Sequence, residues 1–388
     1  MNSVLMQLSE ENQELAKTVR NFANQVIAPV AAKHDEEHTF PYEVIKQLGA
    51  MGIMGLPFPE DVGGMGGDFL SLCLAIEEIS CVDQSVGVTI EASVGLGSMP
   101  IYRFGTEDQK KRFLPPLVAG EALAAFGLTE PDGGSDASGL RTTARLENGE
   151  WIINGSKTFI TNSGTSITSL VIVACVTGTK PDGSKEISTI IVPNGTPGFT
   201  VDPAYRKLGW HASDTHPLSF NNVHVPENNL LGERGRGYAI FLQSLDEGRI
   251  AIAALAVGAA QGCINESLRY AKERKAFGKF IGQHQVIAFK IAEMEARTHV
   301  ARLAYYHAAS LAADAKDFKT EASIAKLVAS NAAMDNARDA TQIFGGYGFM
   351  DEFPVARHYR DSKILEIGEG TSEVQKILIA RSLGLKAE

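Results

Sequence analysis

Trp151-Ile152-Ile153-Asn154-Gly155-Ser156-Lys157-Thr158-Phe159-Ile160-Thr161 is the stretch in which the chain departs most clearly from helical periodicity. Its β-branched and aromatic residues favour extended backbone. The pair Asn154-Gly155 is typical of a two-residue hairpin turn. The stretch therefore predicts a β-hairpin whose two strands lie on either side of Asn154-Gly155.

Further β-rich runs follow this stretch. Residues 170–176 and 187–192 are separated by the turn sequence Pro181-Asp182-Gly183-Ser184, and residues 218–225 form another run. Short apolar runs bounded by such turn residues are typical of strands. The sequence predicts an antiparallel β domain over residues 123–232.

The region before this domain, residues 1–122, has helical periodicity. Ser9 is the expected N-cap of a first helix, and Pro41 opens a second helix that ends near Gly52. A long apolar helical region follows, over residues 69–104. The first helix is supported by apolar residues at helical spacing, namely Leu15, Val19, Phe22 and Val26.

Helical periodicity also returns after the β domain, over residues 233–388. Alanine and leucine occur on several faces of these helices, which indicates a bundle with extensive burial. The predicted fold is thus α with a middle β domain. The four long helices are expected at about residues 237–274, 284–313, 319–344 and 372–383.

Composition restricts the classes of function. The 388 residues carry a formal net charge of -10, which argues against non-specific binding to nucleic acid or to anionic membranes. The four cysteines are scattered, with no CxxC motif and no His pair at metal spacing, so we expect reduced thiols, no metal site and a cytoplasmic protein. Glu10, Glu11 and Glu14 are inconsistent with a signal or transit peptide. The longest apolar run, residues 250–260, is too short to span a membrane and indicates a buried helix.

A carboxylate with unusual neighbours lies near the C-terminus, in Lys363-Ile364-Leu365-Glu366-Ile367-Gly368-Glu369-Gly370-Thr371-Ser372-Glu373-Val374-Gln375. A helix is expected to begin just after Glu369, with Ser372 as N-cap and Gln375 completing a capping box. Taken alone, Glu369 is explained by the favourable contact of an acid with a helix N-terminus.

Five further motifs allow both a structural and a functional interpretation. Residues 126–136 are an ordinary turn or a backbone that approaches a ligand closely, and residues 157–162 are β-core or a strand that flanks a flavin ring. Residues 246–249 hold an arginine paired either with Asp246 or Glu247 or with an anionic or carbonyl ligand. Residues 273–279 are a solvated charge run or a phosphate contact, and residues 342–348 are a helix C-cap or a backbone packed against a partner.

In their order and spacing, these motifs resemble the acyl-CoA dehydrogenase family of FAD-dependent flavoproteins over nearly the whole chain, with the short/branched-chain type most similar. The resemblance implies an N-terminal helical domain, a middle β domain and a C-terminal four-helix bundle. It implies α,β-dehydrogenation of an acyl-CoA thioester to the trans-2-enoyl-CoA, with electrons passed to an electron-transfer flavoprotein. The alternative is a flavin oxidase or monooxygenase on the same scaffold.

The resemblance also implies roles for individual residues. Glu369 matches the catalytic base; in some members the base instead lies at the position of Gly248, which cannot act as one. No metal is expected. The implied substrate contacts are Ser135, Asp246, Arg249 and Gly370. The implied FAD contacts are Phe126, Leu128, Thr129, Gly134, Ser135, Phe159, Ile160, Thr161, Arg274, Phe277, Gln285, Gln342, Ile343, Gly345, Gly346, Thr371, Ser372 and Glu373.

In this family, the contacts from Arg274 to Gln285 and from Gln342 to Gly346 reach the cofactor of a neighbouring subunit. The resemblance therefore implies a homo-oligomer, usually a tetramer, that acts in fatty acid or branched-chain amino acid catabolism without nucleic-acid or membrane partners. The sequence departs from the family pattern at two positions. Phe159 replaces a frequent tryptophan, which affects the shielding of the flavin, and Gly368 replaces a frequent tyrosine and leaves room for a branched or bulkier acyl chain. We place Glu91 near the closed end of the acyl pocket. Acyl chain length is not predicted.

Overall fold

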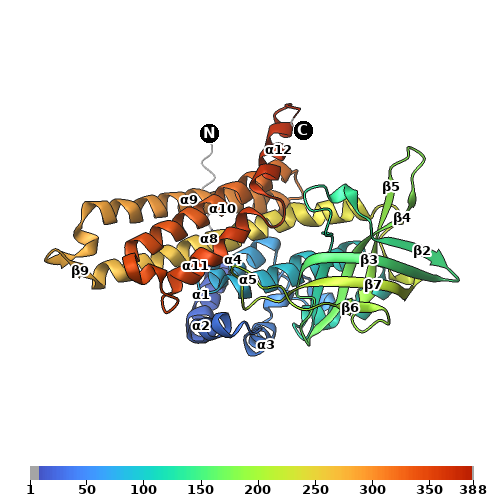
Figure 1. Cartoon of the computed structure of the whole chain (residues 1–388), viewed down its shortest axis with the longest axis horizontal. Helices are drawn as coiled ribbons and strands as arrows, with labels where there is room; N and C mark the ends of the chain where they lie inside the picture. Colours follow the sequence, from blue (N-terminus) through green and yellow to red (C-terminus); the bar gives the residue numbers. More distant parts are fainter. Residues whose placement is uncertain (1–7, 387–388) are drawn as a thin grey trace.

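The computed structural model describes residues 8–386, which form a helical N-terminal part, a single β-sheet and a bundle of long helices (Figure 1). The expected order of helical, β and helical parts is confirmed. The domain boundaries at residues 122/123 and 232/233 remain predictions, and the outermost residues of the two end domains, 1–7 and 387–388, lie outside the described range.

The N-terminal part begins at Ser9, whose side chain accepts a hydrogen bond from the Asn12 N–H, so the predicted N-cap is confirmed. Pro41 precedes the second predicted helix as expected. The apolar region over residues 69–104 is helical but interrupted at Asp83, which caps a new helix. The helices are α1 Glu10–Phe22, α2 Ala28–Glu37, α3 Tyr42–Ala50, α4 Phe69–Ser80, α5 Gln84–Glu91, α6 Met99–Phe104 and α7 Glu107–Val118, with π-helical turns at Ala23–Ile27 and Ala92–Ser98.

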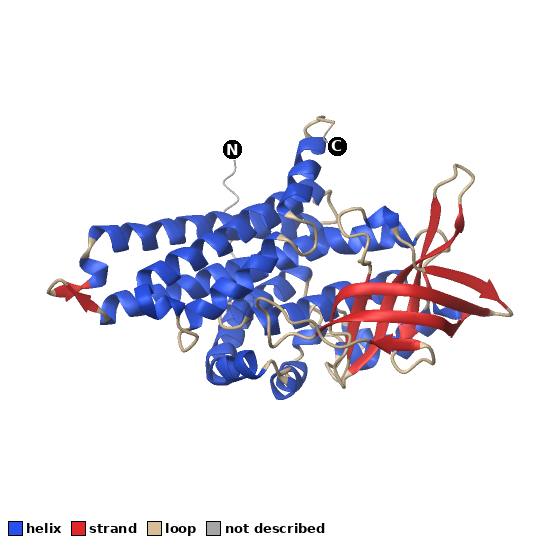
Figure 2. Cartoon of the chain, viewed as in Figure 1, coloured by secondary structure: helices blue, strands red, loops and turns tan. Residues whose placement is uncertain are grey.

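The β domain is one twisted sheet that packs at the end of the helical parts (Figure 2). Its strands run in the order β6-β7-β3-β2-β4-β5-β8, and β1 pairs with β4. The prediction of a purely antiparallel domain was wrong, because β1 and β2 both run parallel to β4. The strands are β1 Leu123–Gly127, β2 Thr143–Glu147, β3 Glu150–Thr161, β4 Thr168–Thr179, β5 Lys185–Pro193, β6 Phe199–Val201, β7 Thr215–Pro226 and β8 Leu230–Leu231.

The predicted hairpin at Asn154-Gly155 was wrong. The turn lies at Asn148-Gly149, where both residues have the left-handed backbone that a tight hairpin turn requires, with φ of 51° and 80°. Glu147 then pairs with Glu150. Asn154-Gly155 instead lies inside the long strand β3, where the register against β7 shifts between Ile153 and Gly155. The second Asn-Gly pair is therefore a strand irregularity rather than a turn.

The C-terminal part contains the three longest helices, which lie side by side (Figure 1). All four predicted helices are present, but a further helix, α11, packs against α8 and α10, while α12 projects from the bundle and packs against α10. The elements are α8 Gly237–Glu273, α9 Gln285–Ala313, α10 Lys319–Phe344, α11 Pro354–Ser362 and α12 Ser372–Ser382, with a small hairpin of β9 Lys275–Ala276 and β10 Lys279–Phe280.

The main core joins the N-terminal helices to the middle of α8. Residues 250–260, predicted to form a buried helix, lie fully inside α8 and are buried. Within residues 8–386, no helix is long and apolar enough to cross a membrane. The same part of the chain holds no group of three His, Cys, Asp or Glu side chains able to bind a metal.

Candidate active site

Glu369 lies in a tight corner between the 3-10 turn Lys363–Glu366 and α12. Glu369 and Gly370 both have left-handed backbone, with φ of 52° and 95°. This corner moves the helix start, so Thr371, not the predicted Ser372, is the N-cap and accepts from the Val374 N–H at 3.3 Å. The predicted capping box was therefore wrong.

The Gln375 side chain forms hydrogen bonds with the backbone of the Glu369–Gly370 corner instead of with the N-cap residue of the helix. Its side-chain amide donates to the carbonyl oxygens of Gly370 at 2.9 Å and of Glu369 at 3.4 Å. Gln375 is buried, so its amide is a fixed part of this corner. The backbone N–H of Glu369 has no acceptor among the described residues.

The carboxylate of Glu369 is directed at α8. Its Oε2 lies too close to the position of a Cβ on Gly248 for both atoms to fit, and its Cδ is 3.2 Å from that position. Oε2 is buried and receives no hydrogen bond from any residue in the range 8–386. A buried carboxylate oxygen without a donor is costly and indicates a site whose partner is a ligand or a shared proton.

A second carboxyl group, Glu91 of α5, is the neighbour that interacts most directly with Glu369. Glu91 is buried, and neither of its oxygens has a hydrogen-bond donor within the described chain. Burial, and after it the Glu369 carboxylate, raises the pKa of Glu91 well above its ordinary value. Burial raises the pKa of Glu369 to about 7, opposed by the Glu91 carboxyl group and by the charges of Lys326 and Arg249. Of the two carboxyl groups, Glu91 is therefore the one more readily protonated, and Glu369 is the one more readily ionised.

Arg249 follows Gly248 in α8, and only part of its guanidinium group is hydrogen-bonded. Its Nη1 donates to Asp246 at 2.5 Å, which is the structural ion pair considered from the sequence. Its Nε is buried without an acceptor in the described part of the chain. The neighbouring Glu247 pairs with Arg103 of α6. Arg249 therefore keeps a buried donor available for an anionic or carbonyl group.

Phe159 is presented by an irregularity in β3. Its backbone is left-handed, with φ of 61°, and the register against β7 shifts between Lys157 and Ile160. Bulky residues adopt this conformation rarely, and such strain clusters at functional sites. The Phe159 side chain is 65% exposed and contacts the Tyr205 ring, with centroids 5.2 Å apart. Ile160, in contrast, packs in the sheet core, which leaves its backbone for any ligand contact at this position.

An ion pair that sequence reasoning missed joins this strand to the loop after β1. The buried Lys157 ammonium donates to Glu130 at 2.7 Å and to the Leu128 carbonyl at 3.1 Å. The Thr158 N–H donates to the Thr129 carbonyl at 2.9 Å. The predicted FAD contacts Leu128, Thr129 and Phe159 are thereby held together. The only available signal was a lysine within an otherwise apolar strand.

Two contacts bring this strand to the carboxyl pair. The amide of Asn162, just after β3, donates to the Thr89 carbonyl of α5 at 2.8 Å, two residues from Glu91. The ring of Phe126 in β1 packs on Phe241 of α8, with centroids 4.3 Å apart. Strand β3 with Phe159, Glu91 of α5 and Gly248 of α8 thus lie close together where the sheet joins α5 and α8. Gly134 and Ser135 are exposed in the loop after β1.

The predicted FAD contacts from Arg274 to Gln285 and from Gln342 to Gly346 are located elsewhere. Arg274 caps the C-terminal end of α8, about 39 Å along the helix from Gly248 at 1.5 Å per residue. There, a hollow of about 590 Å³ is lined by Tyr270, Arg274, Ile281, Ile343, Phe344, Gly345, Gly346, Tyr347 and Met350. Phe277 is 96% exposed, and Gln285 and Gln342 are also exposed. One chain does not bring these residues to Glu369, so they share a site with it only in an assembly of several copies.

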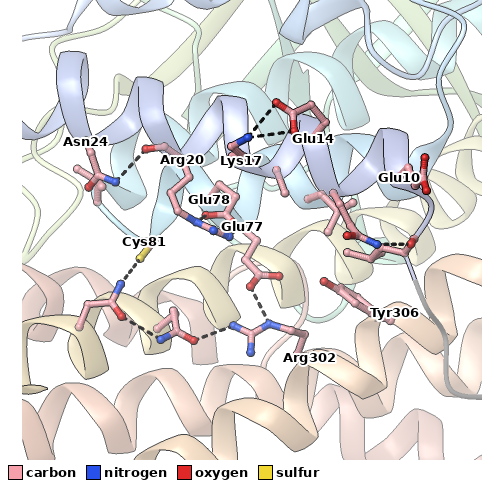
Figure 3. A pocket seen from close by; sticks show the side chains of 17 residues that line it. Glu10, Glu14, Lys17, Arg20, Asn24, Glu77, Glu78, Cys81, Arg302 and Tyr306 are labelled. Atoms are coloured by element: carbon pink, nitrogen blue, oxygen red, sulfur yellow. Dashed lines mark hydrogen bonds and ion pairs between the residues drawn. The ribbon is translucent and has the colours of Figure 1, made fainter.

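A second hollow, of about 940 Å³, lies between α1, α4, α8 and α9 and contains none of the predicted site residues (Figure 3). Its charged groups bind one another: Glu77 accepts from Arg302 at 2.8 Å, and Glu78 accepts from Arg20 at 2.8 Å. Cys81 accepts from Asn265 at 3.3 Å, and burial raises the pKa of its thiol to about 12. With its polar groups already paired, this hollow lacks the unsatisfied groups found around Glu369.

Comparison with known proteins gives a consistent result along the whole chain. Three family models match: acyl-CoA dehydrogenase N-terminal domain over residues 9–121, middle domain over 125–223 and C-terminal domain over 235–384. A probable acyl-CoA dehydrogenase of Bacillus subtilis, YngJ, is 47% identical and is aligned over 97% of this chain and 99% of its own.

Solved structures agree. Butyryl-CoA dehydrogenase from Megasphaera elsdenii is 43% identical, with a TM-score of 0.94 and coverage of 98% of this chain and 99% of its own. A chain from a structure described as an electron transferring flavoprotein of Acidaminococcus fermentans is 41% identical, with a TM-score of 0.95 and coverage of 98% and 100%.

Proposed function

The chain belongs to the acyl-CoA dehydrogenase family of FAD-dependent oxidoreductases, and from this premise we propose that it dehydrogenates a short-chain acyl-CoA thioester between Cα and Cβ, with Glu369 as the base. One observation carries the assignment. The buried Glu369 carboxylate has an oxygen without a donor, and its pKa is about 7. A general base works best when its pKa is near the working pH.

FAD supplies the acceptor for the hydride that leaves the β-carbon. Glu369 removes the α-proton, and the closed junction between α5, α8 and the sheet excludes water from the developing charge. The unpaired backbone N–H of Glu369 is available to the thioester oxygen, where it would stabilise the enolate. Leu128, Thr129 and Phe159 would hold the flavin, since the Lys157–Glu130 pair fixes the loop that carries two of them against β3.

Arg249 and Asp246 are proposed to contact the acyl-CoA, because the buried Nε of Arg249 has no protein acceptor in the described chain. Gly370 and the exposed Ser135 are proposed as further substrate contacts. Thr371, Ser372 and Glu373 are proposed as FAD contacts from the start of α12. The Ser372 hydroxyl is buried and without a partner within residues 8–386, which supports this role.

The acyl group is proposed to be short. The similarity to a butyryl-CoA dehydrogenase supports this, and Glu91, which is buried and interacts with Glu369, is proposed to lie near the closed end of the acyl pocket. Gly368 has no side chain and leaves room for branching near the thioester. Straight and branched short-chain thioesters are therefore both proposed substrates, in fatty acid or branched-chain amino acid catabolism.

An electron-transfer flavoprotein is the proposed electron acceptor, supported by the similarity to the Acidaminococcus fermentans structure. A homotetramer is proposed because the Arg274 hollow and Glu369 are too far apart to serve one FAD within one chain. The four free cysteines, three of them buried, support the proposed cytoplasmic location.

The decisive experiment is an anaerobic screen of the FAD-loaded protein with acyl-CoA thioesters of graded length and branching. Bleaching of the flavin by short-chain thioesters is the expected result. An unchanged flavin spectrum with every thioester would contradict the proposal. Rapid reoxidation of the reduced flavin by oxygen alone would instead favour the oxidase alternative.

A further inference from the structure

A second titratable group is buried beside the Glu369 corner, and no motif in the sequence pointed to it. Lys326 lies in the middle of α10 and has no exposed surface. Its ammonium donates to the carbonyl oxygen of Gly370 at 2.7 Å. Burying an ammonium group is costly unless it is paired and hydrogen-bonded. The fold nevertheless places this charge one residue from the proposed base.

The charges around Lys326 explain why it stays an ammonium. Burial and the nearby Arg249 lower its pKa to about 8, whereas Glu369, Glu366 and Glu373 act in the opposite direction. Of these carboxylates, Glu369 has the largest effect. In return, Lys326 and Arg249 both lower the pKa of Glu369, against the effect of burial. The ammonium therefore favours the ionised form of the base, the form that can accept a proton.

Lys326 also fixes the geometry of the corner. Glu369 and Gly370 both have left-handed backbone, which is disfavoured for a glutamate. Two side chains hold this conformation, since Lys326 and Gln375 both donate to the Gly370 carbonyl. The same corner carries the Glu369 N–H that we propose as a donor to the thioester oxygen.

We propose that Lys326 is a positioning residue for the reaction, whose ammonium clamps the Glu369–Gly370 corner and favours the anionic form of the base. This inference rests on the proposed function, with Glu369 as the base. Lys326 acts through Glu369 and does not itself take part in proton or hydride transfer. The groups that set the charge at Glu369 are then Glu91 from α5, Arg249 from α8 and Lys326 from α10.

The test compares Lys326→Gln, Lys326→Met and Lys326→Arg with Lys290→Met as a matched control. Lys290 forms an ion pair with Asp339 between α9 and α10, so its loss perturbs the same helices without touching the Glu369 corner. The readout is the pH dependence of flavin reduction by an acyl-CoA thioester, together with KM, FAD content and Tm.

In Lys326→Gln, the amide still reaches the Gly370 carbonyl but the charge is lost. We expect the ascending limb of its pH profile to move alkaline by about one unit, which lowers the rate roughly tenfold on that limb and restores it at high pH. KM should change less than kcat. Lys326→Met should show the same shift with a further loss at all pH values, and Lys326→Arg should recover the wild-type profile.

A Lys326→Gln profile that coincides with that of Lys290→Met would overturn the proposal. A uniform loss with an unshifted profile and a lowered Tm would also overturn it, since it would mark a merely structural role. If none of the thioesters reduces the flavin of the wild-type protein, the proposed function fails, and this result is distinct from failure of the clamp. The titration of Glu369 is then followed without substrate, by infrared difference spectra that subtract Glu369→Gln. An unshifted titration in Lys326→Gln decides against the clamp. If Lys326→Gln does not fold, Lys326→Arg is compared with the wild-type protein, and an unshifted titration there decides for the clamp.

Discussion

The carboxylate of Glu369 occupies the space that a side chain at Gly248 would need. The two residues come from α8 and from the corner before α12, and Oε2 of Glu369 would overlap a Cβ at residue 248. The residues on either side of Gly248 are fixed by ion pairs, Glu247 to Arg103 and Arg249 to Asp246. The α8 backbone therefore cannot easily move away.

Gly248→Ala should separate activity from stability. Alanine is favoured over glycine in a helix interior by about 1 kcal/mol, which offsets part of the steric cost. The added Cβ displaces the Glu369 carboxylate, and a displacement of about 1 Å costs on the order of 10²-fold in rate. We expect a folded, FAD-containing protein whose flavin reduction is about 10²-fold slower in stopped-flow measurements. A wild-type rate would show that Glu369 does not act from this position.

Glu369→Gln keeps the shape of the side chain and removes the base. We expect a folded, FAD-bound protein with a rate lower by roughly 10²-fold or more. Single-turnover flavin reduction under anaerobic conditions measures this step directly. Near-normal reduction by a thioester that bleaches the wild-type protein would reject Glu369 as the base.

The same substitution should change stability with pH. Burial raises the pKa of Glu369 to about 7, above its ordinary value near 4.5, so the folded protein prefers the protonated side chain. The stability linked to this preference is fully present below the unfolded pKa and is lost as pH rises through 7. Glu369→Gln, which stays neutral, should therefore gain Tm relative to wild type above pH 7, with the difference vanishing near pH 4. A pH-independent difference in Tm would mean that Glu369 is not desolvated.

Glu91 should tune the base through its proton. The Glu91 carboxyl lowers the pKa of Glu369, so Glu91→Leu, which removes that polar group from the buried pair, should raise that pKa. The ascending limb of the pH profile for flavin reduction should then move alkaline. Glu91→Gln, which retains a donor, should move it less. Identical profiles for both variants and the wild-type protein would show that the two carboxyl groups do not share a proton.

How much the sequence predicts depends on whether a feature is local. Ser9, Pro41 and the helix periods identify α1, α3 and the long helices because caps and apolar spacing act within a few residues. Asn148-Gly149 and Asn154-Gly155 carry the same turn signal, and only the pairing of β2 with β3 selects the first.

Contacts between residues far apart in the chain were not predicted, because the sequence signals act only within a few residues. The interaction of Glu369 with Gly248 and that of Lys326 with Gly370 join segments far apart in the chain. Neither leaves a local pattern. Thr371 rather than Ser372 caps α12 because two consecutive left-handed residues precede it, and glutamate at the first of them gives no local indication of that conformation.

Gly368→Tyr should test the role of the residue before the base. The Gly368 backbone is not left-handed, and a Cβ there would meet the Ile364 carbonyl at 3.5 Å and its Cγ1 at 4.0 Å, which are ordinary contacts. The tyrosine should therefore be tolerated by the fold, with Tm close to wild type. Its ring would fill the room that we assign to a branched acyl group, so kcat/KM for branched short-chain thioesters should fall more than that for butyryl-CoA. Gly368→Ala is the control, because its single methyl group should leave the ratio of the two kcat/KM values nearly unchanged. Equal losses for branched and straight substrates in Gly368→Tyr would mean that this position does not face the acyl chain.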